Sequence, residues 1–195
     1  MERKLRPITD SEFDKVYPKR IIDLSSVHWT PIEIAKIALE WLQVNKKSHV
    51  LDIGSGVGKF CIIGATSSEG KFSGVEKRPD LVRIGKKICA DKKLENVSFI
   101  NSDITQIEFN KYNAFYYYNP FCEQIALDDF IDDTITFSHD KYRMYEDYVF
   151  SQLEKQPIGT RIVTYCSQRF ALPSSYSLKN VSFNGSLALW VKIED

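Results

Sequence analysis

Three glycines at alternating positions form the most specific pattern in this chain. Gly54, Gly56 and Gly58 follow the apolar run at 50–53 and precede a second apolar run at 60–63. Glycine lets the backbone turn sharply and lets a ligand approach it closely. The first turn of a helix offers unpaired N–H groups. The pattern therefore predicts a strand, a ligand-binding turn and a helix, in that order.

Neither of two common phosphate-binding motifs fits this turn. A P-loop needs a glycine where Ile53 stands and a hydroxyl residue where Phe60 stands. The dinucleotide motif GxGxxG needs a glycine in place of Lys59. Asp52 at the end of the strand would repel a pyrophosphate, so we expect a cationic ligand, such as one with an ammonium or sulfonium group. The alternative for Asp52 is a structural acid that binds backbone N–H groups.

Two further acids follow predicted strands. Glu76 ends the strand 72–76, about 20 residues beyond the glycine turn, where it could accept both hydroxyls of a ribose. Asp103 follows the strand 97–100 and could accept from an adenine amino group, with Ile104 flanking the ring. The structural alternatives are a helix cap for Glu76 and a simple turn for Asp103.

Two more segments could contact a reacting group. Asn119-Pro120-Phe121 follows the predicted strand 114–118, and its alternative is a strand-to-loop turn with an aromatic plug. The second segment is 26–31, where Thr30 could contact a ligand carboxylate. Thr30 also fits the N-cap of a capping box with Glu33. Trp29 in this segment could be a ligand contact or an apolar staple, and His28 could be a base or a surface residue.

Strands and helices must alternate to position these residues. Helices are predicted behind Thr30, around 60–63, over 79–91 and, as one or two helices, over 123–155. The predicted strands are 49–53, 72–76, 97–100, 114–118 and 161–165, then 176–183 and 187–193 around an Asn184-Gly185 hairpin turn. This order predicts an α/β fold with a mostly parallel sheet covered on both faces. It excludes a TIM barrel, an all-α bundle and a β-sandwich.

From about residue 25 to the end, the chain resembles the class I S-adenosylmethionine-dependent methyltransferases. The resemblance lies in residues 52–58, Glu76, Asp103-Ile104, Asn119-Pro120-Phe121 and the closing hairpin. It implies a three-layer Rossmann-like sheet of order 3-2-1-4-5-7-6, with strand 7 antiparallel. It also implies that the backbone of 54–58, Ser55 included, meets the methionine part of S-adenosylmethionine, Glu76 the ribose and Asp103 the adenine.

The same resemblance makes Asn119, Pro120 and Phe121 the candidate catalytic residues. They match only part of the N-P-P-Tyr/Phe motif of amino-group methyltransferases, because Phe121 replaces the second proline and Cys122 the aromatic residue. We expect Asn119 to orient the acceptor and Phe121 to wall the pocket. The departure puts nitrogen as the acceptor atom in doubt, and it does not favour nucleic acid as the substrate.

The composition of the chain limits its domain number and the kinds of partner that it can bind. The 195 residues are 43% apolar and 13% aromatic, enough for one core, so we expect a single domain. We expect 1–25 to be an N-terminal arm, or a short irregular helix packed on the domain, and 26–195 to be the cofactor-binding core. The 26 basic residues balance 26 acidic ones, which lowers the expectation of bulk binding to nucleic acid or membrane without excluding a local basic patch. We expect a cytoplasmic protein with no leader sequence and no metal site.

The four cysteines stand far apart, without metal-ligand or redox spacing, and are expected to be reduced and structural. The expected function is methyl transfer to an unidentified acceptor, which is a small molecule, a protein side chain or RNA. Two alternatives to this function remain. One is a nicotinamide-dependent oxidoreductase on a related sheet. The other is a non-catalytic module that binds S-adenosylmethionine.

Overall fold

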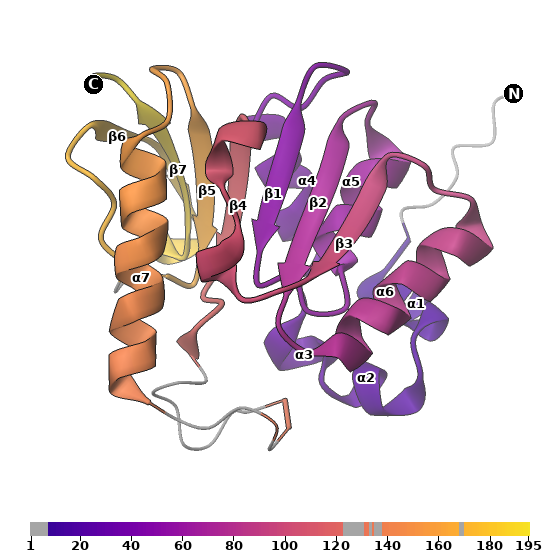
Figure 1. The fold of residues 1–195 in the computed structure, drawn as a ribbon. Helices are drawn as coiled ribbons and strands as arrows, with labels where there is room; N and C mark the ends of the chain where they lie inside the picture. Colours follow the sequence, from indigo (N-terminus) through magenta and orange to yellow (C-terminus); the bar gives the residue numbers. More distant parts are fainter. Residues whose placement is uncertain (1–7, 123–130, 133, 135–137, 168–169) are drawn as a thin grey trace, which may run out of the picture.

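A computed structural model describes residues 8–122, 131–132, 134, 138–167 and 170–195. Its centre is a seven-stranded sheet of order β3-β2-β1-β4-β5-β7-β6, in which β7 runs antiparallel to both of its neighbours (Figure 1). The predicted topology is therefore confirmed. The strands are β1 (His49–Ile53), β2 (Lys71–Glu76), β3 (Val97–Asn101), β4 (Ala114–Tyr118), β5 (Arg161–Tyr165), β6 (Tyr176–Ser182) and β7 (Leu187–Lys192).

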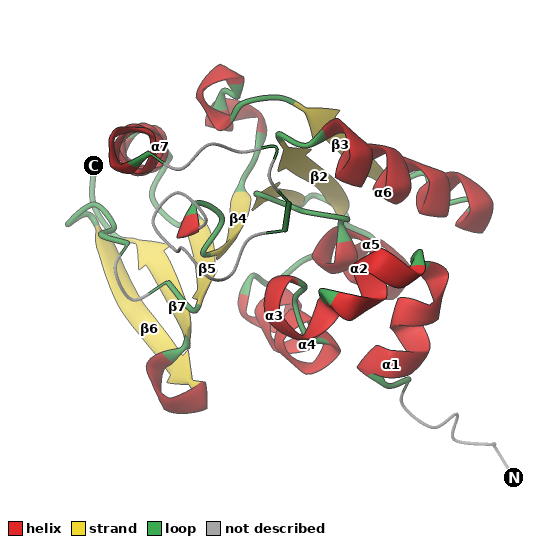
Figure 2. Ribbon diagram, turned by 90° about the horizontal axis from the view of Figure 1, so that it is seen from below, coloured by secondary structure: helices red, strands yellow, loops and turns green. Residues whose placement is uncertain are grey.

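Helices cover both faces of this sheet, which makes three layers (Figure 2). One face carries α4 (Ile32–Trp41), α5 (Lys59–Ser67) and α6 (Pro79–Lys92). The other face carries α7 (His139–Glu154) with the short helices η2 (Ile104–Gln106) and η3 (Phe109–Lys111). Each face has its own apolar cluster because side chains alternate along a strand. On β4, Tyr116 belongs to the first cluster and Tyr117 to the second.

The described segment before α4 folds into short helices that pack on the domain. These are α1 (Asp10–Phe13), η1 (Asp14–Val16), α2 (Lys19–Asp23) and α3 (Ser25–His28). Tyr17 and Ile21 from this segment are buried in the cluster that also holds Val57 and Phe60. The segment thus packs against the glycine turn and the start of α5.

The predicted capping box at Thr30 does not form. The N-cap of α4 is Pro31, without a side-chain cap, and the Thr30 hydroxyl lies 3.2 Å from the Tyr116 hydroxyl. The backbone N–H of Ile32 instead donates to Asp10 Oδ1 at 3.0 Å. Thr30 is therefore buried against Tyr116. Asp10 of α1, and not Thr30, accepts a backbone N–H at the start of α4.

Two other predicted segments differ from the structure at their bounds. One or two helices were predicted over 123–155, and α7 begins at His139, behind Ser138, which accepts from the N–H of Lys141 at 3.2 Å. Residues 131, 132 and 134 are not helical, and 123–130, 133 and 135–137 lie outside the described residues. The turn of the last hairpin is the helical turn η5 (Phe183–Gly185), which includes Phe183 as well as the predicted Asn184-Gly185.

Candidate functional site

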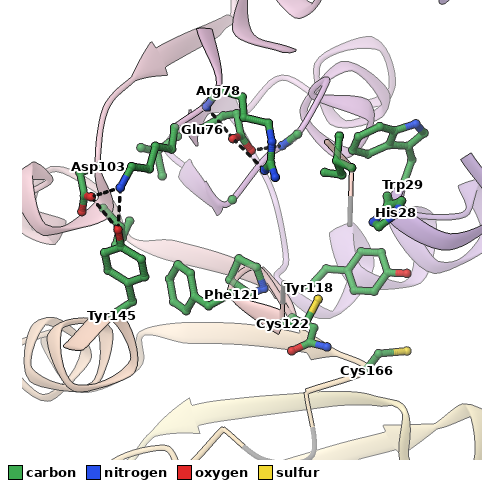
Figure 3. Close-up of a pocket in the computed structure, with 18 of the residues that line it drawn as sticks. His28, Trp29, Glu76, Arg78, Asp103, Tyr118, Phe121, Cys122, Tyr145 and Cys166 are labelled. Carbon is green, nitrogen blue, oxygen red and sulfur yellow. Dashed lines mark hydrogen bonds and ion pairs between the residues drawn. The ribbon is translucent and has the colours of Figure 1, made fainter. Parts of the chain in front are cut away.

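A pocket of about 360 Å³ opens at the carboxyl ends of the parallel strands β1, β2 and β4 (Figure 3). This is the edge at which open α/β sheets bind ligands. Eight of the twelve residues predicted for the site line the pocket. They are Gly54, Gly56, Glu76, Asp103, Ile104, Asn119, Pro120 and Phe121.

The other four predicted residues do not line the pocket in the described part of the chain: Thr30, Asp52, Ser55 and Gly58.

The glycine turn forms a cradle that no other residue type would fit. Gly54 has φ +73°, and a Cβ there would lie 2.3 Å from Pro120 Cβ. Gly56 has φ +54°, and a Cβ there would lie 2.4 Å from Trp29 Cζ3. The turn is therefore squeezed between Pro120 of the loop after β4 and Trp29 of the N-terminal segment, and its backbone faces the pocket.

Glu76 is held in the pocket wall by the backbone. Its Oε2 accepts the N–H of Gly56 at 3.1 Å, and its Oε1 accepts the N–H of Arg78 at 2.8 Å. Arg78 is buried too, and its Nε donates to Asp132 Oδ1 at 3.0 Å. Glu76 thus binds the N–H of Arg78, the residue directly before α6, and it also fixes the glycine turn.

Asp103 is already fully bonded. Its Oδ1 accepts the backbone N–H and the hydroxyl of Thr105, at 3.1 and 2.9 Å. Its Oδ2 accepts Lys77 Nζ at 2.9 Å and the Tyr145 hydroxyl at 2.8 Å. Burial acts to raise the pKa of Asp103, but these hydrogen bonds outweigh it and lower the pKa to about 2. A carboxylate accepts about four hydrogen bonds, so an adenine amino group could bind Asp103 only by displacing one of these partners.

Asp52 lies behind the glycine turn. It is buried on β1, and its Oδ2 accepts a weak hydrogen bond from Cys61 Sγ at 3.4 Å. Burial raises the pKa of Asp52 to about 7. The charge of Glu76 acts in the same direction, while the bond from Cys61 opposes it. A nearby cationic ligand would favour the ionised form of this carboxyl group.

This raised pKa predicts a pH-dependent stability. Between the ordinary pKa of 3.8 and about 7, the folded protein keeps a proton on Asp52 that the unfolded chain releases. We expect this group's contribution to the unfolding free energy to be complete below pH 4 and to be lost as the pH rises to about 7. Urea unfolding at several pH values tests this, with Asp52→Asn as the comparison. If the unfolding free energy of the variant changes with pH as steeply as that of the wild type, groups other than Asp52 cause the pH dependence.

Asn119 stands at the junction of β4 and the pocket with φ +37°, which is left-handed backbone. Its N–H donates to Ser167 Oγ at 2.9 Å, and its carbonyl accepts the N–H of Cys122 at 3.3 Å. In the described part of the chain its side-chain amide has no hydrogen bond to the protein. Phe121 packs 5.0 Å from the ring of Tyr145 and 5.9 Å from that of Tyr117, between centroids.

The N-terminal segment supplies one side of the pocket, through Val27, His28 and Trp29. Trp29 Nε1 donates to the carbonyl of Ile21 at 2.9 Å, and the ring is buried over the glycine turn. Trp29 is therefore a wall of the pocket rather than the apolar staple of a capping box. Thr30 points into the core, bonded to Tyr116, and does not line the pocket.

Sequence reasoning missed several lining residues. Tyr145 projects from α7, and Cys166 directly follows β5 with φ +49°. Cys166 could have been found, because β5 neighbours β4 and its carboxyl end reaches the same edge of the sheet. Cys122 and Cys166 are half-buried and line the pocket, whereas Cys61 and Cys89 are buried. The position of Tyr145 carries no local signal, since it depends on how α7 packs.

Comparison with known proteins places the chain in a family. A model described as "Methyltransferase domain" matches residues 44–184. The chain therefore belongs to the methyltransferase family, and its sheet has the class I topology. The cofactor of this class I family is S-adenosylmethionine. Membership of this family rules out the alternative of a nicotinamide-dependent oxidoreductase.

Individual relatives match less of the chain. The 23S rRNA (uracil(1939)-C(5))-methyltransferase RlmD of Shewanella sediminis is 38% identical over 72 residues, 37% of this chain and 16% of the relative. RlmD of Klebsiella pneumoniae is 34% identical over 74 residues, 38% of this chain and 17% of the relative. The chain thus matches about a sixth of the length of these curated relatives.

Solved structures share the fold. An RNA methyltransferase from Salinibacter ruber, solved with S-adenosyl-L-homocysteine, superposes with a TM-score of 0.60 and 22% identity, over 85% of this chain and 94% of that one. TrmN from Thermus thermophilus superposes with a TM-score of 0.63 and 14% identity, over 90% of this chain and 53% of that one. Within the described residues no helix is long and apolar enough to cross a membrane.

Proposed function

We propose that this chain transfers a methyl group from S-adenosylmethionine to an uncharged, planar group bound beside Asn119, and that this group is a base of an RNA. The division of the pocket carries the proposal. The ionic side chains of Glu76, Arg78 and Asp103 gather at one end, where Lys77 donates to Asp103, whereas Tyr118, Cys122 and Cys166 lie at the other (Figure 3).

Two groups at the second end of the pocket are neutral near pH 7. Burial raises the pKa of the Tyr118 hydroxyl and of the Cys166 thiol above their ordinary values, so neither group ionises there. Neither group therefore offers a charged acceptor a counter-ion in return for its lost hydration. A neutral ring can instead contact aromatic and thiol surfaces without this cost.

The residues at the other end fit the cofactor in part. The backbone of Gly54 and Gly56 allows close approach, and Glu76 places a carboxylate in the wall for the ribose hydroxyls. Bound S-adenosylmethionine supplies a sulfonium methyl carbon that an acceptor lone pair or carbon nucleophile can attack in line. The saturated bonds of Asp103 do not fit the expected contact with the adenine amino group, so we assign Asp103 to fixing Lys77 and Tyr145.

The protein's part in the transfer is orientation and exclusion of water. The side-chain amide of Asn119 and the carbonyl of Pro120 orient the acceptor. Phe121, buried between Tyr117 and Tyr145, walls the pocket on the sheet side. The choice of RNA draws on the similar proteins, since RlmD is a 23S rRNA (uracil(1939)-C(5))-methyltransferase and the Salinibacter ruber protein is an RNA methyltransferase. The balanced net charge gives RNA no bulk attraction.

Transfer of labelled methyl groups tests this function. The wild-type protein is incubated with methyl-labelled S-adenosylmethionine and with RNA, protein or small-molecule fractions of a cell extract. We expect label in RNA that ribonuclease releases and that excess S-adenosylhomocysteine suppresses. Label confined to protein or small molecules would contradict the RNA acceptor. Cofactor binding without transfer to any fraction would favour a non-catalytic binding module.

A further inference from the structure

Lys59 is a buried cation at a position where a helix disfavours one. It is the first residue of α5, directly after Gly58, and its side chain is only 2% exposed. The amino end of a helix has a positive electrostatic potential, and burial removes the ammonium from water. A lysine can remain charged in such a place only if carboxylates compensate it.

The compensating groups all come from the N-terminal segment. Lys59 Nζ lies 2.7 Å from Asp10 Oδ1 and 2.7 Å from Asp14 Oδ1. Asp14 is itself buried, and its other oxygen accepts the Ser25 hydroxyl. Lys59 Nζ also lies 5.6 Å from the ring centroid of Phe13. One ammonium group therefore ties α1, η1 and α3 to the residue that follows the glycine turn.

The same segment forms a wall of the pocket. Val27 and His28 at the end of α3, and Trp29 directly after it, line the pocket, and Trp29 lies against Gly56. The carbonyl of Val27 accepts the hydroxyl of Tyr118 at 2.8 Å across the pocket rim. Lys59 does not line the pocket in the described part of the chain. Its side chain can act on a ligand only through the elements that it holds.

We propose that Lys59 is a positioning residue for the cofactor: its ion pairs with Asp10 and Asp14 dock the N-terminal helices so that Trp29 covers Gly56 and completes the pocket. The inference rests on the proposed function, in which the cofactor lies on the glycine turn. Without the ammonium, buried Asp14 is left without its counter-ion, which favours undocking of the segment. Apparent cofactor affinity then falls in proportion to the docked fraction.

The test combines calorimetry with S-adenosylhomocysteine and limited chymotrypsin digestion. Lys59→Met keeps the length of the side chain and removes its charge. We expect its affinity to fall about tenfold or more, as for a segment docked in one molecule in ten. Cleavage should appear at Tyr17 and Trp29, which are only 4% exposed in the docked protein. The double variant Lys59→Met, Asp14→Asn removes the uncompensated charge of Asp14. It should recover much of the affinity for S-adenosylhomocysteine and much of the resistance to chymotrypsin.

Lys87→Met is the matched control, because Lys87 pairs with Asp91 on the exposed surface of α6 and should change neither measurement. If Lys59→Met does not fold, Asp10→Asn replaces it. Asp10 is 46% exposed, and the variant keeps an oxygen for the N–H of Ile32, so a smaller change in the same direction is expected.

Wild-type affinity in Lys59→Met would overturn the inference, as would reduced affinity without new cleavage. Failure of the wild type to bind S-adenosylhomocysteine would contradict the proposed function instead. Digestion of the same variants would then still decide whether Lys59 docks the segment.

Discussion

Removal of the Asn119 side chain should lower turnover by about 10²–10³-fold, the range found when one positioned group is lost from a reacting centre, and should leave cofactor affinity unchanged. The side chain has no hydrogen bond to the described part of the protein, yet it lines the pocket beside the glycine turn. Its amide is therefore available to orient an acceptor. Asn119→Gly is the better variant, because φ is +37° at this position and alanine would add backbone strain.

Turnover and apparent KM of Asn119→Gly are measured with the RNA fraction that takes the label. Phe121→Ala serves as the comparison, since it opens the wall next to Tyr145 and should raise the KM for the acceptor more than it lowers turnover. Equal loss of cofactor affinity and turnover in Asn119→Gly would mean that Asn119 shapes only the loop. The search for the orienting group would then move to His28 and the neighbouring lining residues.

Replacement of Glu76 by alanine should weaken cofactor binding by about 30- to 150-fold. Loss of charge-assisted hydrogen bonds to two ribose hydroxyls costs about 2–3 kcal/mol, and 1.4 kcal/mol corresponds to tenfold in affinity. The structure adds a second effect. Glu76 also accepts the N–H groups of Gly56 and Arg78, so the variant should melt at a lower temperature than the wild type.

Calorimetry with S-adenosylhomocysteine and thermal unfolding separate the two roles. Asp132→Asn is a suitable control, because it weakens the partner of buried Arg78 and leaves the carboxylate of Glu76 in place. A lowered melting temperature with unchanged affinity in Glu76→Ala would make Glu76 a structural acid only. The ribose would then be bound by other groups.

Most of the fold could be predicted because the local patterns agree with it. The strands β1, β4 and β5 begin and end at the predicted residues, since each is a short apolar run with clear ends. The start of α7 at His139 could not be placed within the helical region predicted over 123–155, because the residues before His139 have a similar apolar and aromatic composition. Thr30 was misassigned because the acceptor for the N–H of Ile32 is Asp10, 22 residues earlier in the chain.

The candidate site divides in the same way. The glycine turn, the acid at Glu76 and the loop at Asn119 could be found from the residues alone, because each depends on a residue's own backbone freedom or on its place at the end of a strand. The state of the charged groups follows from the three-dimensional packing. The fold surrounds Asp103 with Lys77 and Tyr145, buries Asp52, and pairs Lys59 with two carboxylates from the N-terminal helices. Such states do not follow from local sequence, because a charge responds to every group and every solvent boundary near it in space.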